Sequence, residues 1–432
     1  MGNMMSKAKF LIKKGFFHIF GVNVINSLIS FVTNIVIVRF LSKGDYGIFG
    51  NAYNAYSIFM LFSGIGMISG LLQYCSERRP EEEKNSYYKF SLSAGLLFNT
   101  LLCLGMIVYA SFGKFNIKET PQYIIELAFL PFFEYAFQFI GTIFRIQREN
   151  KKYSLLMNIN TISYCIFACG GAYFGGIHGT ILGRYIAFAI SIVMGFTMCR
   201  QMLPEVFHSV RLKNLQVKGF LKYSSTCCAS TSISQLLYLL DVFMIGTYFA
   251  ATAVASYKTA TLIPNALSLI PTSIMVFIYP YFAEHNTDFK WIKKNSIRLF
   301  QGLACMNALI SLVLYFGAPL IIHIIWDDRY MDSVRPFQIL SISYFFLATF
   351  RVPAGNILAM LRKVKVNLLV SIISGIANVV FCVIFIRIWG SNGAALATLV
   401  VVLISSFIAF PYLMHHIKKN LNQEELTSPP IG

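Results

Sequence analysis

Residues 224–280 read SSTCCASTSISQLLYLLDVFMIGTYFAATAVASYKTATLIPNALSLIPTSIMVFIYP. Two apolar segments of membrane-helix length follow each other here, and Asp241 and Lys258 interrupt them. A charge inside such a helix costs roughly 2.5–3.5 kcal/mol on insertion scales, so it is tolerated where it faces a protein-lined aqueous path or an opposite charge. The stretch therefore predicts a membrane protein with a polar interior.

The composition of the whole chain indicates a polytopic membrane protein. Its 432 residues are 56% hydrophobic and 12% charged, and the mean hydropathy is +0.63. Soluble domains are about 25% charged. A bilayer span takes roughly 20 residues. We expect an all-α fold with about 12 transmembrane helices, near residues 16–38, 47–73, 90–111, 122–143, 154–174, 178–199, 224–247, 254–280, 299–325, 335–359, 366–387 and 392–414.

The distribution of basic residues predicts the orientation of the chain. With residue 1 inside, most of the 36 Lys and Arg residues fall in inner loops. The positive-inside rule then places both termini in the cytoplasm. This topology, with attraction to anionic lipid headgroups, also accounts for much of the net charge of +18. Nucleic-acid binding is a poor interpretation, because the basic residues are scattered over many short loops.

The chain contains an internal repeat. Residues 40–52 align with 248–260 at an offset of 208, and Gly176-x-x-Gly179 aligns with Gly390-x-x-Gly393 at an offset of 214. Each half holds six spans, an even number, so both halves begin inside and are parallel repeats. We expect a six-helix lobe at 1–199, a cytoplasmic linker at 200–223 and a second six-helix lobe at 224–432.

Polar residues concentrate in the first two spans of each half. Asn34 and Asn51 lie in spans 1 and 2, and Asp241 and Lys258 lie in their counterparts, spans 7 and 8. Polar groups inside spans turn toward the bundle interior or an aqueous cavity. We infer a central cavity between the two lobes. The alternative for each single Ser or Thr is an ordinary hydrogen bond between helices.

The first loop and its echo in the second half resemble a known family. The first pattern is Arg39-Phe40-Leu41-x-x-x-Asp45-Tyr46-Gly47, and the echo consists of Asp241, Gly246, Phe249, Val254, Tyr257 and Ala260. This resembles the MOP superfamily, and within it the Wzx-type flippases of polysaccharide biosynthesis.

The resemblance implies a function and a location. It implies alternating access between two lobes in a bacterial cell membrane. The substrate it implies is an undecaprenyl-pyrophosphate-linked oligosaccharide, moved from the inner to the outer leaflet for surface polysaccharide synthesis. Membrane lipids and other polysaccharide-assembly proteins are the further partners that it implies.

Several cationic and amide residues are candidates for substrate binding. Guanidinium matches phosphate geometry in a bidentate way, and an ammonium group supplies a compact charge. The candidates are Lys258, Arg351, Arg184, Asn34 and Asn51. The alternatives are an ion pair with Asp241 for Lys258, a side chain that extends to the interface for Arg351, and contact with the outer interface for Arg184.

Two acidic residues are candidates for ion coupling. Asp241 and Glu134 lie inside spans 7 and 4, and either one is suited to bind a proton or Na⁺. A neutral, hydrogen-bonded carboxyl group is the alternative for Glu134. We expect no other cofactor and no metal site, since no Walker sequence occurs and the His residues lack ligand spacing.

Two rival functions remain open from the sequence. One is a cation-coupled multidrug or small-molecule exporter of the same fold, which predicts an acidic, aromatic cavity. The resemblance implies that such exporters often carry an acidic residue in the first helix, and span 1 here has none. An enzyme predicts a substantial domain outside the membrane with clustered acids or His, whereas the outer loops here are short. We therefore expect a flippase rather than an exporter or an enzyme.

Overall fold

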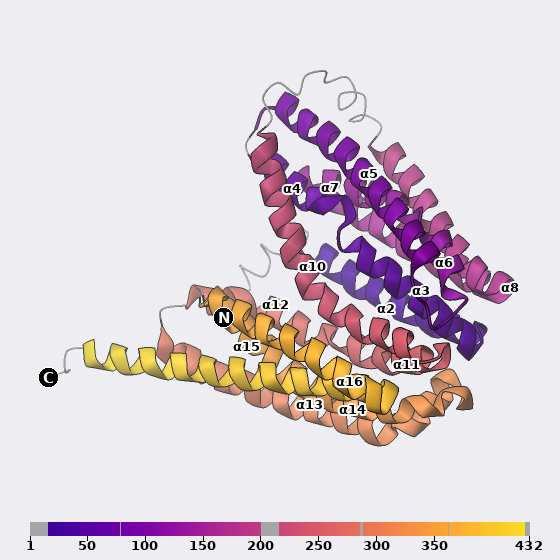
Figure 1. The fold of residues 1–432 in the computed structure, drawn as a ribbon. Helices are drawn as coiled ribbons and strands as arrows, with labels where there is room; N and C mark the ends of the chain where they lie inside the picture. Colours follow the sequence, from indigo (N-terminus) through magenta and orange to yellow (C-terminus); the bar gives the residue numbers. More distant parts are fainter. Residues whose placement is uncertain (1–15, 78, 200–215, 286–287, 362, 428–432) are drawn as a thin grey trace. The chain divides into compact units, whose positions relative to one another are not determined.

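The chain is an all-α protein in the computed structural model. The structure describes residues 16–77, 79–199, 216–285, 288–361 and 363–427, and these contain helices and no strand (Figure 1). A membrane-spanning segment must satisfy its backbone hydrogen bonds internally, which a helix does. The expected fold class is confirmed.

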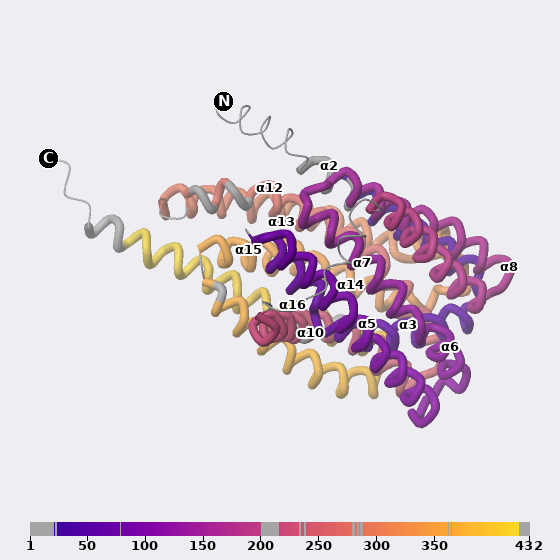
Figure 2. The backbone as a smooth tube through the Cα atoms, turned by 90° about the horizontal axis from the view of Figure 1, so that it is seen from above, coloured from indigo at the N-terminus to yellow at the C-terminus, as the bar shows by residue number. Residues whose placement is uncertain are grey.

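The first of two compact units comprises residues 1–239. Its helices pack side by side as a bundle (Figure 2). They are α2 (Phe16–Phe40), α3 (Lys43–Met60), η1 (Ser63–Gly66), α4 (Met67–Ser76), α5 (Glu81–Phe112), α6 (Thr120–Leu127), α7 (Leu130–Ile146), α8 (Asn150–Met198) and most of α10 (Val217–Tyr248).

The second compact unit comprises residues 240–432. Its core is an apolar cluster that includes Phe282, Phe300 and Leu413. The unit contains the end of α10, then α11 (Ala251–Leu267), α12 (Leu269–Glu284), α13 (Phe289–Trp326), η2 (Asp328–Ser333), α14 (Val334–Phe346), η3 (Leu347–Arg351), α15 (Val352–Met360) and α16 (Val364–Thr427).

The twelve expected spans correspond to these helices. Among the residues that the structure describes, eight helical segments are long and apolar enough to cross a membrane. Two of them, α8 and α16, are interrupted by a non-helical glycine and contain two expected spans each. The shorter apolar helices in α2 and α10 supply the remaining two. The expected lobe boundary stays a prediction, because residues 200–215 of the linker lie outside the described residues.

The internal repeat recurs in the backbone. Gly176 has φ 59° and ψ −134°, and Gly390, at the expected offset of 214, has φ 56° and ψ −129°. Glycine populates this positive-φ region without the steric cost that other residues meet. The two arms of each hairpin then approach closely, since a Cβ on Gly179 or Gly393 would lie 2.1 Å or 1.9 Å from a backbone oxygen of the opposite arm.

A turn between helices recurs at the same offset. The amide of Glu149 donates to the carbonyl of Phe144 at 2.9 Å, and the amide of Lys363 donates to that of Leu358 at 2.8 Å. The offset changes along α13, since α5 and α13 begin 208 residues apart, at Glu81 and Phe289, and end 214 apart, at Phe112 and Trp326. The repeat therefore extends to matching hydrogen bonds, and α13, with 38 residues against 32 in α5, accounts for the longer second half.

Candidate functional site

The second span is broken inside its apolar stretch. The helix stops after Met60, and Gly64, Ile65 and Gly66 all have positive φ before α4 begins. A β-branched residue such as Ile65 is a clear outlier in this region. A Cβ on Gly64 would lie 2.4 Å from the ring of Tyr135, so the break also allows that ring to pack closely.

Side chains from other helices satisfy the backbone groups that the break frees. Ser232 on α10 donates to the carbonyl of Leu61 at 2.8 Å, and Cys228 donates to the same oxygen at 3.4 Å. The amide of Gly64 donates to Oδ1 of Asn99 at 3.3 Å. An unsatisfied backbone group in an apolar environment is costly, so these contacts allow α3 and α4 to separate.

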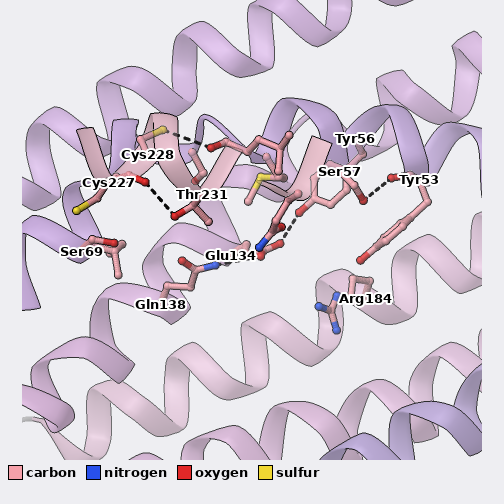
Figure 3. A pocket seen from close by; sticks show the side chains of 16 residues that line it. Tyr53, Tyr56, Ser57, Ser69, Glu134, Gln138, Arg184, Cys227, Cys228 and Thr231 are labelled. Carbon is pink, nitrogen blue, oxygen red and sulfur yellow. Dashed lines mark hydrogen bonds between the residues drawn. The ribbon is translucent and has the colours of Figure 1, made fainter. Parts of the chain in front are cut away.

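A pocket of about 390 Å³ opens beside this break (Figure 3). Five helices of the first unit line it, namely α3 and α4 on the two sides of the break, α7, α8 and α10. The lining residues are Tyr53, Tyr56, Ser57, Met60, Leu61, Ser63, Gly66, Ile68, Ser69, Glu134, Gln138, Arg184, Cys227, Cys228, Thr231 and Gln235. The break thus creates a polar pocket within membrane-spanning helices.

Glu134 lies on α7 in the middle of the view of the pocket (Figure 3). The hydroxyl of Tyr56 donates to its Oε2 at 2.5 Å, and Gln138 donates to its Oε1 at 3.1 Å. Gln138 stands four residues after Glu134, on the same face of α7. Both carboxylate oxygens are therefore held by neutral donors, and their other lone pairs face a polar pocket.

Arg184 lies on α8, beside Tyr53 in the same view (Figure 3). Its guanidinium carbon is 4.5 Å from the ring centroid of Tyr164 and 4.3 Å from that of Phe188. Its Nε is buried and has no hydrogen-bond partner among the described residues. Rings that cover the guanidinium faces leave its edges available for hydrogen bonds.

The structure brings Arg184 and Glu134 into one pocket but does not join them. The part of the chain that the structure describes has no ion pair between the two side chains. Each is within electrostatic reach of the other. The pocket thus contains one cation and one anion that are not hydrogen-bonded to each other.

Asp241 belongs to a separate, buried cluster in the second unit. It accepts hydrogen bonds from Tyr257 at 2.6 Å, from Thr398 at 2.9 Å and from the thiol of Cys382 at 2.9 Å. The amide of Asn378 lies near the same carboxylate. All of these partners of Asp241 are neutral. The described residues show no ion pair between Asp241 and Lys258.

Lys258 and Arg351 lie elsewhere in the second unit, and both are half-buried. Lys258 follows Tyr257 on α11. Arg351 ends the π-helical turn η3, and its Nη1 would lie 2.7 Å from a Cβ on Gly355. Their role in substrate binding stays a prediction.

The two asparagine candidates make structural contacts. Asn34 donates to the carbonyl of Ser30 in its own helix at 2.8 Å. Asn51 is buried and donates to the hydroxyl of Thr120 at 3.2 Å, which links α3 to α6. Neither lines the pocket of the first unit, and the expected cavity between the lobes stays a prediction.

Sequence reasoning missed several residues that form these two polar centres. Tyr53, Tyr56 and Gln138 were not singled out, although the spacing of Gln138 from Glu134 places both on one helix face. Cys382 and Thr398 were also missed, because they lie 141 and 157 residues from Asp241. No group of three or more His, Cys, Asp or Glu residues suited to a metal occurs in the described residues.

A family model for a polysaccharide biosynthesis protein matches residues 12–286 of the chain. An uncharacterized membrane protein of Methanocaldococcus jannaschii is 21% identical over 400 residues, which cover 86% of this chain and 77% of that protein. These two matches connect the sequence to membrane proteins and to polysaccharide assembly.

Two solved structures show the same fold. The lipid II flippase MurJ in an inward closed conformation is 15% identical, covers 96% of this chain and 93% of its own, and has a TM-score of 0.72. An inward-facing MATE multidrug resistance transporter of the MOP superfamily is 13% identical, covers 94% and 96%, and has a TM-score of 0.74. The chain therefore has the fold of the MOP-superfamily transporters.

Proposed function

Because the chain belongs to the polysaccharide biosynthesis protein family, we propose that it is a flippase for a lipid-linked oligosaccharide. The substrate is a glycan on a polyprenyl diphosphate such as undecaprenyl pyrophosphate. The protein moves it from the inner to the outer leaflet of the bacterial cell membrane by alternating access, for surface polysaccharide synthesis. The family match is the observation that carries this proposal.

The polar pocket of the first unit supports the proposal physically. A sugar has many hydroxyl groups, and moving each from water to an apolar medium without a partner costs roughly 2–7 kcal/mol. The polyprenyl tail is apolar and can stay in the lipid. The protein therefore has to supply polar partners for the headgroup alone, and a pocket inside membrane-spanning helices does so.

The cations of the second unit are the partners that we propose for the diphosphate. Lys258 and Arg351 each lie in a membrane-spanning segment and are half-buried. A positive charge there offsets the cost of removing a phosphate from water.

Asp241 is our candidate for coupling transport to an ion gradient. Equal binding on both sides of the membrane gives no net transport, so a gradient or removal of the product must set the direction. The carboxyl group of Asp241 is surrounded by neutral hydroxyl, amide and thiol groups. We propose that it binds H⁺ or Na⁺ and that no other cofactor takes part.

The proposal is tested by reconstituting the purified protein into liposomes with a fluorescent polyprenyl-diphosphate oligosaccharide. We expect the fraction of lipid accessible to an external quencher to change faster than in protein-free liposomes. Lys258→Ala and Arg351→Ala should slow this transfer, with Arg387→Ala, an exposed cation on Tyr248, as the control.

The same preparation distinguishes the rival function. The MATE structure matches as well as the flippase structure does, so the fold alone leaves a cation-coupled exporter open. Drug-driven proton release without transfer of any polyprenyl-diphosphate sugar would refute the flippase and support the exporter.

A further inference from the structure

We propose that the pocket of the first unit binds sugar rings of the substrate and not its diphosphate. This inference rests on the proposed flippase function and assigns one part of the substrate to one site. It changes the role expected for Arg184, from a phosphate ligand to a sugar ligand.

The charges of the pocket argue against a diphosphate. Among its lining residues Arg184 is the one cation and Glu134 the one anion, so the formal charges cancel. A diphosphate carries at least two negative charges, and Glu134 would repel it at close range in a medium of low dielectric constant. A neutral polar ligand meets no such repulsion.

The hydrogen-bonding groups of the pocket match those of a sugar. A hydroxyl group donates one hydrogen bond and accepts others, so a polyhydroxylated ligand needs donors and acceptors together. Arg184 can only donate, an ionised Glu134 can only accept, and Gln138 does both. The buried Nε of Arg184, which has no partner among the described residues, gains one when a sugar oxygen lies beside it.

Two tyrosine rings add an apolar surface to this polar lining. Tyr53 and Tyr56 both line the pocket, and their ring centroids lie 5.3 Å apart. The C–H face of a sugar ring is apolar and packs against aromatic rings, while its hydroxyl edge takes the hydrogen bonds. A phosphate group has no such face.

The size of the pocket limits how much glycan it holds. Small-molecule sites measure about 300–1,000 Å³, and this pocket, at about 390 Å³, lies near the lower end. The pocket therefore suits one or two sugar rings and not a complete oligosaccharide.

Saturation-transfer NMR on the purified full-length protein in detergent tests this assignment. The neutral probes are glucose, N-acetylglucosamine and their methyl glycosides, and ³¹P NMR follows inorganic pyrophosphate. We expect saturation transfer to at least one neutral sugar, and that sugar should retain its signal in excess pyrophosphate. Loss of the sugar signal on adding pyrophosphate would overturn the assignment, as would the absence of transfer to every sugar.

Matched variants locate the sugar site. Arg184→Gln and Glu134→Gln each leave a polar side chain that can form hydrogen bonds but remove one charge. We expect each to weaken sugar binding about tenfold, because hydrogen bonds to charged groups are the stronger ones. The control is Arg387→Gln, which removes another arginine held on a tyrosine ring. Sugar binding that is unchanged in both pocket variants would place the site elsewhere.

Alkylation of a native cysteine provides a second test of sugar binding, which uses the unmodified protein and so does not depend on the folding of any variant. All nine cysteines are free, Cys227 lines the pocket and Cys305 is exposed outside it. Alkylation followed by mass spectrometry should show that the bound sugar slows labelling of Cys227 but not of Cys305. Equal rates at Cys227 with and without the sugar would contradict the assignment.

The two proposals can fail separately. If lipid-linked oligosaccharide crosses the liposome membrane but no sugar protects Cys227, the flippase stands and the pocket assignment falls. If a sugar protects Cys227 but no lipid-linked oligosaccharide is moved, the pocket binds sugar and the flippase falls.

Discussion

Asp241 is held by three side-chain donors, and this environment sets what its substitution does. Asp241→Asn keeps the size of the side chain and an oxygen that can accept from Tyr257 and Thr398, but it cannot take up or release a proton. We expect the variant to fold and to lose the response of transport to an imposed pH or Na⁺ gradient. The measurement is the transfer rate in liposomes with and without each gradient.

The control for this substitution is Asp328→Asn, since Asp328 is an exposed residue at the start of η2 and pairs with His323. It should respond to the gradient as the unmodified protein does. A full response in Asp241→Asn would remove Asp241 from the coupling role.

For a single residue, the sequence predicts the helix in which it lies but not the side chains that it contacts. A charge inside an apolar segment marks Asp241, Lys258, Glu134 and Arg184 without any structure. The partner of each charge depends on packing between distant segments, and so Tyr257 and Cys382 could not be read as partners of Asp241. The sequence offered Lys258 as that partner because it lies in the next span at a similar expected depth from the outer end.

At the scale of elements, the two helical hairpins depend on glycines that face backbone. A Cβ on Gly179 would meet the backbone of Gly171, and one on Gly393 would meet that of Phe385. Backbone cannot move aside as a flexible side chain does. We expect Gly179→Ala and Gly393→Ala each to destabilise the protein by about 1–3 kcal/mol, the usual cost of overpacking. The measurement is the melting temperature in detergent, which should fall in both variants.

Gly175→Ala provides the matched control in the same helix. No atom lies within 4 Å of a Cβ at this position. Alanine favours helix over glycine by up to about 1 kcal/mol, so this variant should be neutral or slightly more stable. Equal losses of stability in Gly175→Ala and Gly179→Ala would show that close approach is not the reason for the glycine.

The positions of the helices followed from hydropathy, whereas the breaks within them did not. The second span was expected as one segment over 47–73, and its apolar content gives no sign of where it stops. Three consecutive positive-φ residues divide it, and one of them is Ile65, which has no intrinsic preference for that conformation. Tyr135 and Ser232 lie far along the chain, and only packing brings them to the break.

At the scale of the whole molecule, the orientation in the membrane is open to direct measurement. The positive-inside rule predicts cytoplasmic N- and C-termini. An epitope tag at either end should become accessible to antibody only after the inner membrane is permeabilised. The control is a tag in the 113–119 loop, which the same topology places outside.

Accessibility of a terminal tag in intact spheroplasts would contradict the topology. The prediction is independent of the transport assays, because it depends on the distribution of Lys and Arg between loops and not on the pocket. The lobes expected from the repeat stay a prediction, and the two compact units divide within α10, where a continuous helix carries no boundary signal of its own.

The matching hairpins also reveal an ancestry. Two six-helix halves that share a reversal at Gly176 and Gly390 have the form of a duplicated gene, and duplication leaves each copy free to specialise. Arg184 and Thr398 occupy the same place in the two copies, 214 residues apart. One lies on a tyrosine ring beside a polar pocket, and the other donates to a buried carboxylate. Equivalent positions in the two halves thus carry two different chemistries, as duplication followed by specialisation would leave them.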